Sequence, residues 1–594
     1  MGQFFKMFFA ALLAGVVLMI LPFILMIGFF SALASLGAQP EPVVKPASTL
    51  VIDLSVPIMD RAVEDPMAIF TSFSTMAGNV SMPVSLWEMT ETIAYAAQDE
   101  NIEGISLTGE GFGGGMAQLV AIRKALDEFK ASGKYVTAYA NLYSQGDYIV
   151  KSLADKVFLN PNGTVDFKGM SMTSMFFKGF EQKYGVGVQV FRTGKFKSAV
   201  EPFLLEKMSP ENRRQSMELI STIWDTLSIA AAQSRGYDRE WVDRVASQRL
   251  GFTASGALEC GLVDSLLYAE QYDAYLDSLG GENRVKYAEY ARHVAGRPGM
   301  HGGEDRVAVI YAQGDIVYGK GTVSQISEEA LRKGFEKAAE DDRVKAVVLR
   351  VNSPGGVSIT ADNIWKMVED LKSEKPVVVS MGDYAASGGY YISCGADYIF
   401  AEPTTITGSI GVFAYIPNVE ELAARNGITT DQVSIYPNST DPTILTPVSP
   451  GLSKIIQNSV EQTYSQFVNR VAQGRGMTWD QVDAVAQGRV WSGVSALQIG
   501  LVDEIGGLDR AIAKAADLAG AVDYSVVEYP KTSASSLEQV LSILNSDAQV
   551  KVKELVGEDL YAMYRTVRQV SESGEPVVLT RLPYGVVDTH SLKD

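Results

Sequence analysis

Ser387 is followed by Gly388 and Gly389, after an apolar run that is typical of a strand and before a run that can begin a helix. A serine hydroxyl at such a turn lies near the positive end of the helix dipole and is a candidate nucleophile. Capping of the helix by the serine side chain is the alternative role. A nucleophilic hydroxyl needs an adjacent base, which is usually histidine. The base must be sought elsewhere here, because the histidines all lie outside the periodic segments: His293, His301 and His590.

Two lysines offer a base of another kind. An apolar, strand-like run in residues 188–203 ends in Lys195 and Lys197, whereas the corresponding stretch in the other half of the chain, residues 431–445, contains no lysine. Burial disfavours the charged amine, so the pKa of a buried lysine falls and the amine can accept a proton near neutrality. The alternative is that both lysines lie on a solvated face.

Glycines supply candidate donors for a developing negative charge. The sequence NSPGG follows a buried, strand-like run, and its proline fixes the chain while Gly355 and Gly356 let backbone N–H groups face outward. Together with the N–H of Gly388, such groups can stabilise an oxyanion. The corresponding stretch, residues 105–115, is also rich in glycine but lacks Asn-Ser-Pro, and we interpret it as an ordinary strand-to-helix turn.

The elements that must position these residues occur twice. Residues 231–266 and 471–505 share A-Q-x-R-G, V-D-x-V-A and G-L-V-D in the same order, and an upstream segment ending in an apolar run also recurs. The order of strand, helix and strand predicts βαβ units with a mainly parallel sheet. In this pairing Ser144 is the counterpart of Ser387, but Gln145 replaces the first glycine, so Ser144 is expected to be inert.

The N-terminus differs from the rest of the chain. Residues 7–39 carry no charge, which exceeds the roughly 20 residues that span a bilayer. Because Lys6 precedes this stretch, we expect a signal anchor with a cytoplasmic N-terminus and the bulk of the chain on the other side of the membrane. Cleavage after the small-x-small pattern Ala32-Leu33-Ala34 is the alternative.

The predicted organisation has five parts. The two repeats are α/β domains, the first carrying the lysine and the second carrying the serine. The tail is expected to be helical and to serve packing or oligomer contacts, with an independent interaction tail as the alternative. The parts are residues 1–47 (cytoplasmic stub and transmembrane anchor), 48–285 (first repeat), 286–303 (linker), 304–528 (second repeat) and 529–594 (tail).

The composition limits the classes of partner that this chain is expected to bind. The net charge of −19 and the pI of about 4.8 argue against nucleic acid and against an anionic membrane surface, since both attract basic patches. The two cysteines, Cys260 and Cys394, are expected to be small buried hydrophobic residues rather than a disulfide.

Four motifs together resemble the signal peptide peptidase A, or protease IV, family in its long, duplicated, membrane-anchored form. The motifs are residues 194–203, 352–356, 385–390 and 407–411. The resemblance implies a tandem repeat of the Clp-protease/crotonase-like spiral fold and a serine peptidase that degrades released signal peptides with a serine–lysine dyad. It implies Ser387 as the nucleophile, Lys197 as the general base and Ser409 as the residue that orients the lysine amine.

The resemblance carries further expectations. It implies no metal and no cofactor, and a homo-oligomer with a tetramer favoured. The predicted location is the bacterial inner membrane, with the bulk of the chain periplasmic. Released signal peptides and similar apolar peptides would bind by strand addition. Two alternatives stay open, because a fold alone does not determine function: a catalytically silent scaffold for membrane-protein assembly, and a crotonase-like acyl-CoA enzyme.

Overall fold

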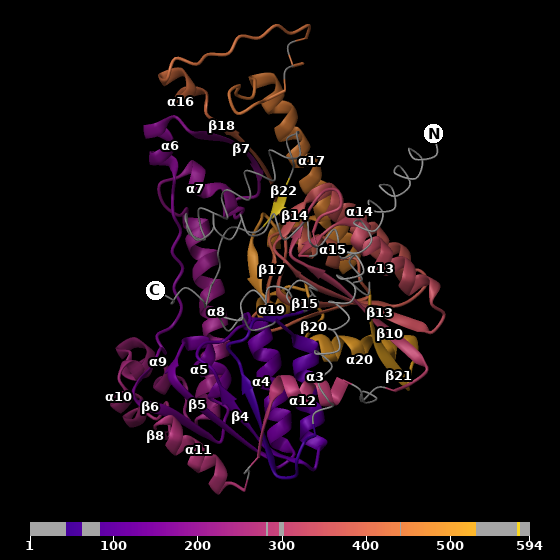
Figure 1. Cartoon of the computed structure of the whole chain (residues 1–594). Helices are drawn as coiled ribbons and strands as arrows, with labels where there is room; N and C mark the ends of the chain where they lie inside the picture. Colours follow the sequence, from indigo (N-terminus) through magenta and orange to yellow (C-terminus); the bar gives the residue numbers. More distant parts are fainter. Residues whose placement is uncertain are drawn as a thin grey trace, which may run out of the picture.

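The computed structural model of this protein describes most of both repeats (Figure 1). The described ranges are residues 43–61, 83–280, 283–295, 302–322, 324–436, 438–439, 441–529 and 579–581. The predicted anchor, the alternative cleavage site and most of the predicted tail lie outside these ranges. Within them, none of the helices combines the length and the apolar character that a membrane span requires.

The first repeat contains a six-stranded parallel sheet. Its strand order is β8-β6-β5-β4-β1-β9, and each neighbouring pair is parallel. The strands are β1 (Ser48–Asp53), β4 (Ile102–Thr108), β5 (Tyr135–Tyr143), β6 (Lys156–Val165), β8 (Ser265–Leu266) and β9 (Asn283–Lys286). The helices of this half are α3 (Leu86–Gln98), α4 (Met116–Ala131), α5 (Gln145–Lys151), α6 (Lys178–Tyr184), α7 (Glu201–Leu204), α8 (Pro210–Ser234), α9 (Arg239–Gln248), α10 (Ala254–Glu259), α11 (Ala269–Ser278) and α12 (Tyr287–Ala295).

The second repeat contains an eight-stranded sheet with the main order β19-β17-β15-β13-β10-β21, in which β17 and β19 are antiparallel. Its strands are β10 (Asp305–Gln313), β13 (Val344–Ser353), β15 (Val377–Ala386), β16 (Tyr398–Ala401), β17 (Ile406–Gly408), β19 (Val490–Ser492), β20 (Glu504–Ile505) and β21 (Tyr524–Tyr529). Its helices are α13 (Glu328–Glu340), α14 (Ser358–Lys372), α15 (Gly388–Ser393), α16 (Glu420–Arg425), α17 (Pro450–Arg475), α18 (Trp479–Val485), α19 (Gly493–Gln498) and α20 (Leu508–Ala519).

The repeated sequence motifs form repeated contacts. Arg235 of the first A-Q-x-R-G motif donates to Asp264 of G-L-V-D at 2.9 Å, and Arg475 donates to Asp503 at the same distance. Each of these aspartates also accepts an N–H from a strand of its own sheet, at 2.8 Å. The motifs therefore recur because each pair ties a helix end to the edge of a sheet, and the predicted duplication of α/β units with a mainly parallel sheet is confirmed.

A third, mixed sheet joins the two repeats. Its order is β12-β11-β14-β22-β18-β7. The strands are β7 (Gly187–Thr193), β11 (Asp315–Ile316), β12 (Gln325–Ile326), β14 (Gly355–Val357), β18 (Val412–Asn418) and β22 (Leu579–Arg581). β7 comes from the first repeat and pairs antiparallel with β18 of the second, and the two run side by side in the upper part of Figure 1. This pairing carries the lysine segment across to the second repeat.

The observed elements differ from the prediction in two places. The expected linker, residues 286–303, contains the last residue of β9 and all of α12, whose Tyr290 is buried and donates to Asp99 at 2.9 Å. Residues 579–581, expected within a helical tail, form a strand instead. Both differences arise from contacts with residues far away in the sequence. The two cysteines are free and buried, as expected.

Candidate active site

Ser387 lies at the sharp turn between β15 and α15. Its backbone has a φ of 56° and a ψ of −117°, a conformation that costs on the order of 1–3 kcal/mol for a residue with a Cβ. Its N–H donates to the carbonyl of Gly408 at 2.8 Å, and its side chain makes no capping bond to α15. The capping role is therefore wrong for Ser387. Strain of this kind is typical of functional sites.

Ser144 has the ordinary geometry that Ser387 lacks. It precedes α5 with a φ of −67°, and its hydroxyl oxygen accepts the N–H of Asp147 at 3.4 Å. The first repeat therefore uses its serine as a helix cap.

The lysine approaches the serine from the first repeat. After β7 the chain runs against the loop before β19, where the N–H of Phe196 donates to the carbonyl of Gln487 at 2.9 Å. Gly488 has a φ of 78°, and a Cβ at this position would lie 2.6 Å from the Cβ of Lys197. Glycine is thus required at 488, because no other residue allows the two segments to lie this close.

Three fully buried side chains meet at the end of this segment. Lys197 Nζ lies 2.7 Å from Ser387 Oγ, and it donates to both Ser409 Oγ and the Ser409 carbonyl, each at 3.0 Å. All three residues have no exposed surface. The structure therefore brings together Ser387, Lys197 and Ser409, which lie in different repeats or on different loops.

Burial determines the protonation of the lysine. Removal of water from the amine lowers the pKa of Lys197 well below its usual value. The Nζ also lies 5.9 Å from the centre of the Phe413 ring, in an apolar setting. An amine in this environment can hold a lone pair toward a hydroxyl and act as a base.

Gln215 of α8 supports the lysine turn. Its amide nitrogen donates to the carbonyl of Phe196 and to Ser198 Oγ, each at 3.0 Å, and its amide oxygen accepts the N–H of Val490 at 3.2 Å. These bonds hold the residues on both sides of Lys197 against the second repeat.

The predicted oxyanion glycines lie on two elements next to the serine. Gly355 and Gly356 form β14 with φ values of 106° and 155°, and the N–H of Gly355 lies 3.2 Å from Ser353 Oγ, to which it donates. Gly388 is the first residue of α15, and the first N–H groups of a helix have no partner within it. The N–H of Ser387 itself is used by Gly408.

An apolar cluster surrounds this site. Phe413 and Tyr415 of β18 are buried together with Ala199 and Val200, which follow the lysine, and the partly buried Val357 of β14 packs against them. The backbone of β22 pairs with β14 and with β18 and is antiparallel to both. The strands on either side of β22 therefore carry apolar side chains next to the lysine segment.

Other candidate groups lie elsewhere. Lys195 is exposed with its Nζ 5.6 Å from the centre of the Phe196 ring, so the solvated-face alternative holds for Lys195 and is wrong for Lys197. His293 lies on α12 with its ring centre 6.1 Å from that of Tyr290. Within the described ranges, no three acidic, histidine or cysteine side chains gather as a metal site.

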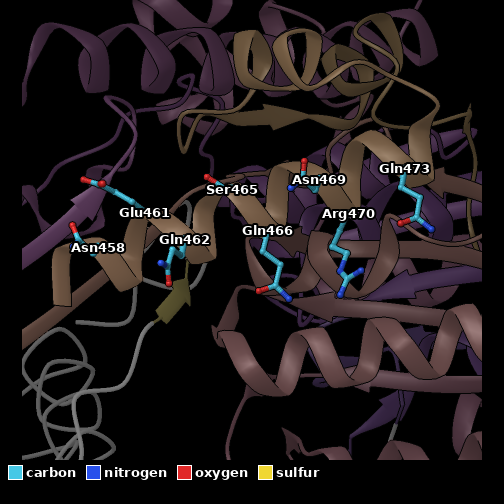
Figure 2. Close-up of a pocket in the computed structure, with 8 residues that line it drawn as sticks. All are labelled: Asn458, Glu461, Gln462, Ser465, Gln466, Asn469, Arg470 and Gln473. Carbon is cyan, nitrogen blue, oxygen red and sulfur yellow. The ribbon is translucent and has the colours of Figure 1, made fainter. Parts of the chain in front are cut away.

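A polar hollow lies along one face of α17, and Figure 2 shows the side chains that line it. They are Asn458, Glu461, Gln462, Ser465, Gln466, Asn469, Arg470 and Gln473. Its one cation, Arg470, lies over the Trp365 ring at 3.7 Å and donates to Asp362 at 3.0 Å. The hollow contains no base or nucleophile with the geometry found at Ser387.

Comparison with known proteins gives consistent matches. The model of peptidase family S49 matches residues 128–280 and 369–522. Protease 4 of Haemophilus influenzae is 34% identical over 500 residues, which cover 81% of each chain. Protease 4 of Salmonella typhi is 36% identical and covers 80% of this chain and 78% of its own length. The chloroplastic serine protease SPPA of Arabidopsis thaliana is 31% identical and covers 78% of this chain and 70% of its own.

Solved structures overlap with smaller parts of the chain. A mutant of the 1510-N membrane-bound stomatin-specific protease in complex with a substrate peptide covers 40% of this chain and 98% of its own at 16% identity, with a TM-score of 0.27. ClpP1 from Listeria monocytogenes covers 34% of this chain and 91% of its own at 17% identity, with a TM-score of 0.22.

The site and the sequence relatives define a serine peptidase. The chain belongs to peptidase family S49, with one matched segment in each repeat. The expected family is thereby confirmed, and the relatives favour a peptidase over a silent scaffold or an acyl-CoA enzyme.

The sequence analysis missed a buried polar cluster beside the glycine strand. It comprises the buried Asp60 and Arg350 and the partly buried Asn352 and Asp383. One signal was available: Arg350 lies within the otherwise apolar run VVLRV, and a charge in a buried strand requires a partner. The partner, Asp60, is 290 residues away, so no local pattern could identify it.

Proposed function

We propose that this chain is a membrane-anchored endopeptidase that degrades released signal peptides and similar apolar peptides with a serine–lysine dyad. The observation that carries the proposal is the 2.7 Å separation of Lys197 Nζ and Ser387 Oγ in a fully buried setting. The apolar cluster around Phe413 and Tyr415 supports the choice of apolar peptides.

Acylation begins with a neutral lysine. A neutral amine has two N–H bonds and one lone pair, and Ser409 offers two oxygens for the two N–H bonds. The lone pair then faces the hydroxyl of Ser387 and takes its proton as Oγ attacks the scissile carbonyl. N–H groups of the glycine elements, with Gly355, Gly356 and Gly388 as candidates, stabilise the oxyanion.

The second half of the reaction restores the enzyme. The tetrahedral intermediate collapses, the C–N bond breaks, and Lys197 delivers its proton to the leaving amine. Water then attacks the acyl-enzyme, with Lys197 accepting a proton, and collapse releases the carboxylic acid and returns the proton to Ser387 Oγ. The reaction as written uses no metal and no cofactor.

Strand addition is the proposed mode of substrate binding. β22 pairs with β14 through Gly355, Gly356 and Val357, and with β18 through Phe413. This pairing supports the idea that an extended backbone can bind between β14 and β18, where main-chain hydrogen bonds bind peptides of varied sequence.

We further propose the spiral form of the family fold, a homo-oligomer with a tetramer favoured, and an inner-membrane location with the bulk of the chain periplasmic. The uncharged residues 7–39 and the preceding Lys6 support the anchor and its orientation. Sedimentation of the detergent-extracted full-length chain tests the oligomer, and a monomer would contradict it.

A serine-reactive fluorophosphonate tests the chemistry. We expect one adduct at Ser387 in the wild-type protein and none in Ser387→Ala. Lys197→Arg should also lose labelling and peptide hydrolysis, because arginine keeps a charge that cannot be released. Lys195→Ala is the matched control and should retain both. Labelling of the Lys197→Arg variant at the wild-type rate would exclude the dyad.

A further inference from the structure

A buried ion pair links the two repeats on β13, the strand that leads into the glycine strand β14. The guanidinium of Arg350, on β13, donates to Asp60 Oδ1 through Nε at 3.0 Å and through Nη2 at 2.6 Å. Asn352, two residues further along β13, donates its amide to Asp60 Oδ2. Asp60 belongs to the first repeat, whereas Arg350 and Asn352 lead into the turn that contains Gly355.

The same cluster holds an irregular part of the serine-bearing strand. Val351 pairs with Met381 and Ser353 pairs with Ala385, so β15 contains two more residues than β13 between these pairs. Arg350 donates to Ser380 Oγ at 2.8 Å and to the carbonyl of Met381 at 3.1 Å, just before this bulge. The amide oxygen of Asn352 accepts the N–H of Tyr384 at 3.1 Å within it.

The first repeat contacts the bulge a second time. Asp383 Oδ1 accepts the N–H of Ala117 at 2.8 Å, in the first turn of α4. Gly115, the residue before α4, lies so close that a Cβ would come within 2.2 Å of the Asp383 carboxyl carbon. The glycine-rich stretch that ends at Gly115 is the counterpart of NSPGG, so it is more than an ordinary turn: it receives the carboxylate of Asp383.

The cluster is absent from the equivalent place in the first sheet. Counted from the first residues of β4 and β13, Ile102 and Val344, the residue that corresponds to Arg350 is Thr108. The arginine and its partner are therefore a feature of the junction and not of the repeated fold. A buried arginine without its carboxylate is strongly unfavourable. Because Asp60 also binds Asn352, we expect the conformation of the turn that contains Asn352 to depend on Asp60.

We propose that Asp60 and Gly115 of the first repeat are positioning residues for peptide hydrolysis: through Arg350, Asn352 and Asp383 they hold the glycine strand and the bulge that leads to Ser387. This inference rests on the proposed function. The first repeat then contributes the lysine and also the geometry of the turn that receives the oxyanion. Such a role affects the transition state more than substrate binding.

Two variants test the proposal from different sides. Asp60→Asn removes the carboxylate, and Gly115→Ala inserts a methyl group against Asp383 at a backbone φ of −81°, where alanine is unstrained. Asp53→Asn is the matched control, because Asp53 ends β1 shortly before Asp60 but is exposed and, among the described residues, accepts hydrogen bonds from the N–H and the hydroxyl of Ser55, at 2.9 and 2.6 Å. Each full-length protein is assayed on an apolar peptide and with a peptide aldehyde, which forms a tetrahedral adduct.

We expect both variants to lose tenfold or more in kcat and in aldehyde affinity, with KM within threefold of wild type and a cooperative thermal transition. The control should match wild type in all four measurements. If kcat and aldehyde affinity stay at wild-type values, or fall only in proportion to the folded fraction, the positioning role is excluded. Should Asp60→Asn fail to fold, the kinetics of Gly115→Ala decide.

The two proposals fail in different ways. Absence of a fluorophosphonate adduct at Ser387 in the wild-type protein would overturn the proposed function and this inference with it. A wild-type adduct together with unchanged kinetics in both variants would overturn only the positioning role.

Discussion

At the scale of single residues, the site depends on keeping a lysine neutral. The Nζ of Lys197 is fully buried and contacts oxygens of Ser387 and Ser409, and among the described residues no carboxylate forms a hydrogen bond or ion pair with it. A carboxylate would stabilise the ammonium and raise the pKa, which would remove the base. The fold therefore holds a buried amine whose charged form is unfavourable, as the proposed dyad requires.

This cost leads to a prediction on stability. The folded-state pKa of Lys197 is lowered, so the unfolded chain binds more protons between that value and about 10.5, and stability rises with pH in this window. Lys197→Met should abolish hydrolysis and raise the melting temperature at pH 7, by about 2–4 °C for each kcal/mol gained. The gain should shrink as the pH approaches 10.5. Thermal scans at pH 7 and pH 10 measure it, and a less stable variant at pH 7 would contradict the argument.

The duplicated serine allows a second prediction. Because Ser144 caps α5, Ser144→Ala should leave peptide hydrolysis near wild type and cost about 0.5–2 kcal/mol of stability. Initial rates and urea unfolding give the two values. A loss of activity above about tenfold, which corresponds to roughly 1.4 kcal/mol in the activation free energy, would show that Ser144 takes part in the reaction.

At the scale of elements, the mixed sheet determines which segments of the two repeats meet at the site. β7 and β18 bring the lysine segment of one repeat to the serine turn of the other, and β22 lies against the glycine strand β14. The strand from the C-terminal part of the chain therefore lies where the substrate backbone is proposed to bind.

Competition between β22 and the substrate is the resulting expectation. Deletion of residues 579–594 should lower KM for an apolar peptide threefold or more, with kcat within twofold of wild type. The reason is that β22 no longer has to leave its place between β14 and β18 before the peptide binds. Deletion of residues 582–594, which keeps β22, is the control and should match the full-length chain. Steady-state kinetics on both truncations decide the matter, and an unchanged KM in the longer deletion would refute competition.

At the scale of the whole molecule, a buried carboxylate, that of Glu402, lies at the junction of the two repeats. Glu402 follows β16 and lines a pocket between α3, α4 and α20, with only 5% of its surface exposed. Burial, partly offset by Arg350, raises the pKa of Glu402 to about 7. The charged carboxylate is thus unfavourable at the junction.

The sign of the resulting pH dependence follows from linkage. The folded-state pKa of Glu402 lies above its unfolded value of 4.5, so its contribution to stability is lost as the pH rises through about 7. Glu402→Gln should therefore stabilise the protein at pH 8, on the order of 2–3 kcal/mol, and have little effect at pH 4.5. Denaturant unfolding at both pH values provides the test. A destabilised variant at pH 8 would mean that the carboxylate is favourably paired.

Local patterns in the sequence determined much of this protein. The duplicated motifs and the α/β repeats could be identified, and Ser387, Lys197 and Ser409 could be selected as candidates, because turns, strand periodicity and short motifs depend on neighbouring residues. The differences between the two repeats also indicated where the candidate catalytic residues lie.

Only the tertiary structure decided which of these residues meet. Lys197 and Ser387 are 190 positions apart, and their contact depends on the pairing of β7 with β18. The strained backbone of Ser387 is likewise accompanied by a hydrogen bond from its N–H to Gly408, which lies on another strand. The junction of Asp60 with Arg350, the strand β22 and the helix α12 were not predicted, since each is stabilised by packing against distant segments. Long-range packing overrides local propensity at these positions, which is why the geometry of the site could not be read from its motifs.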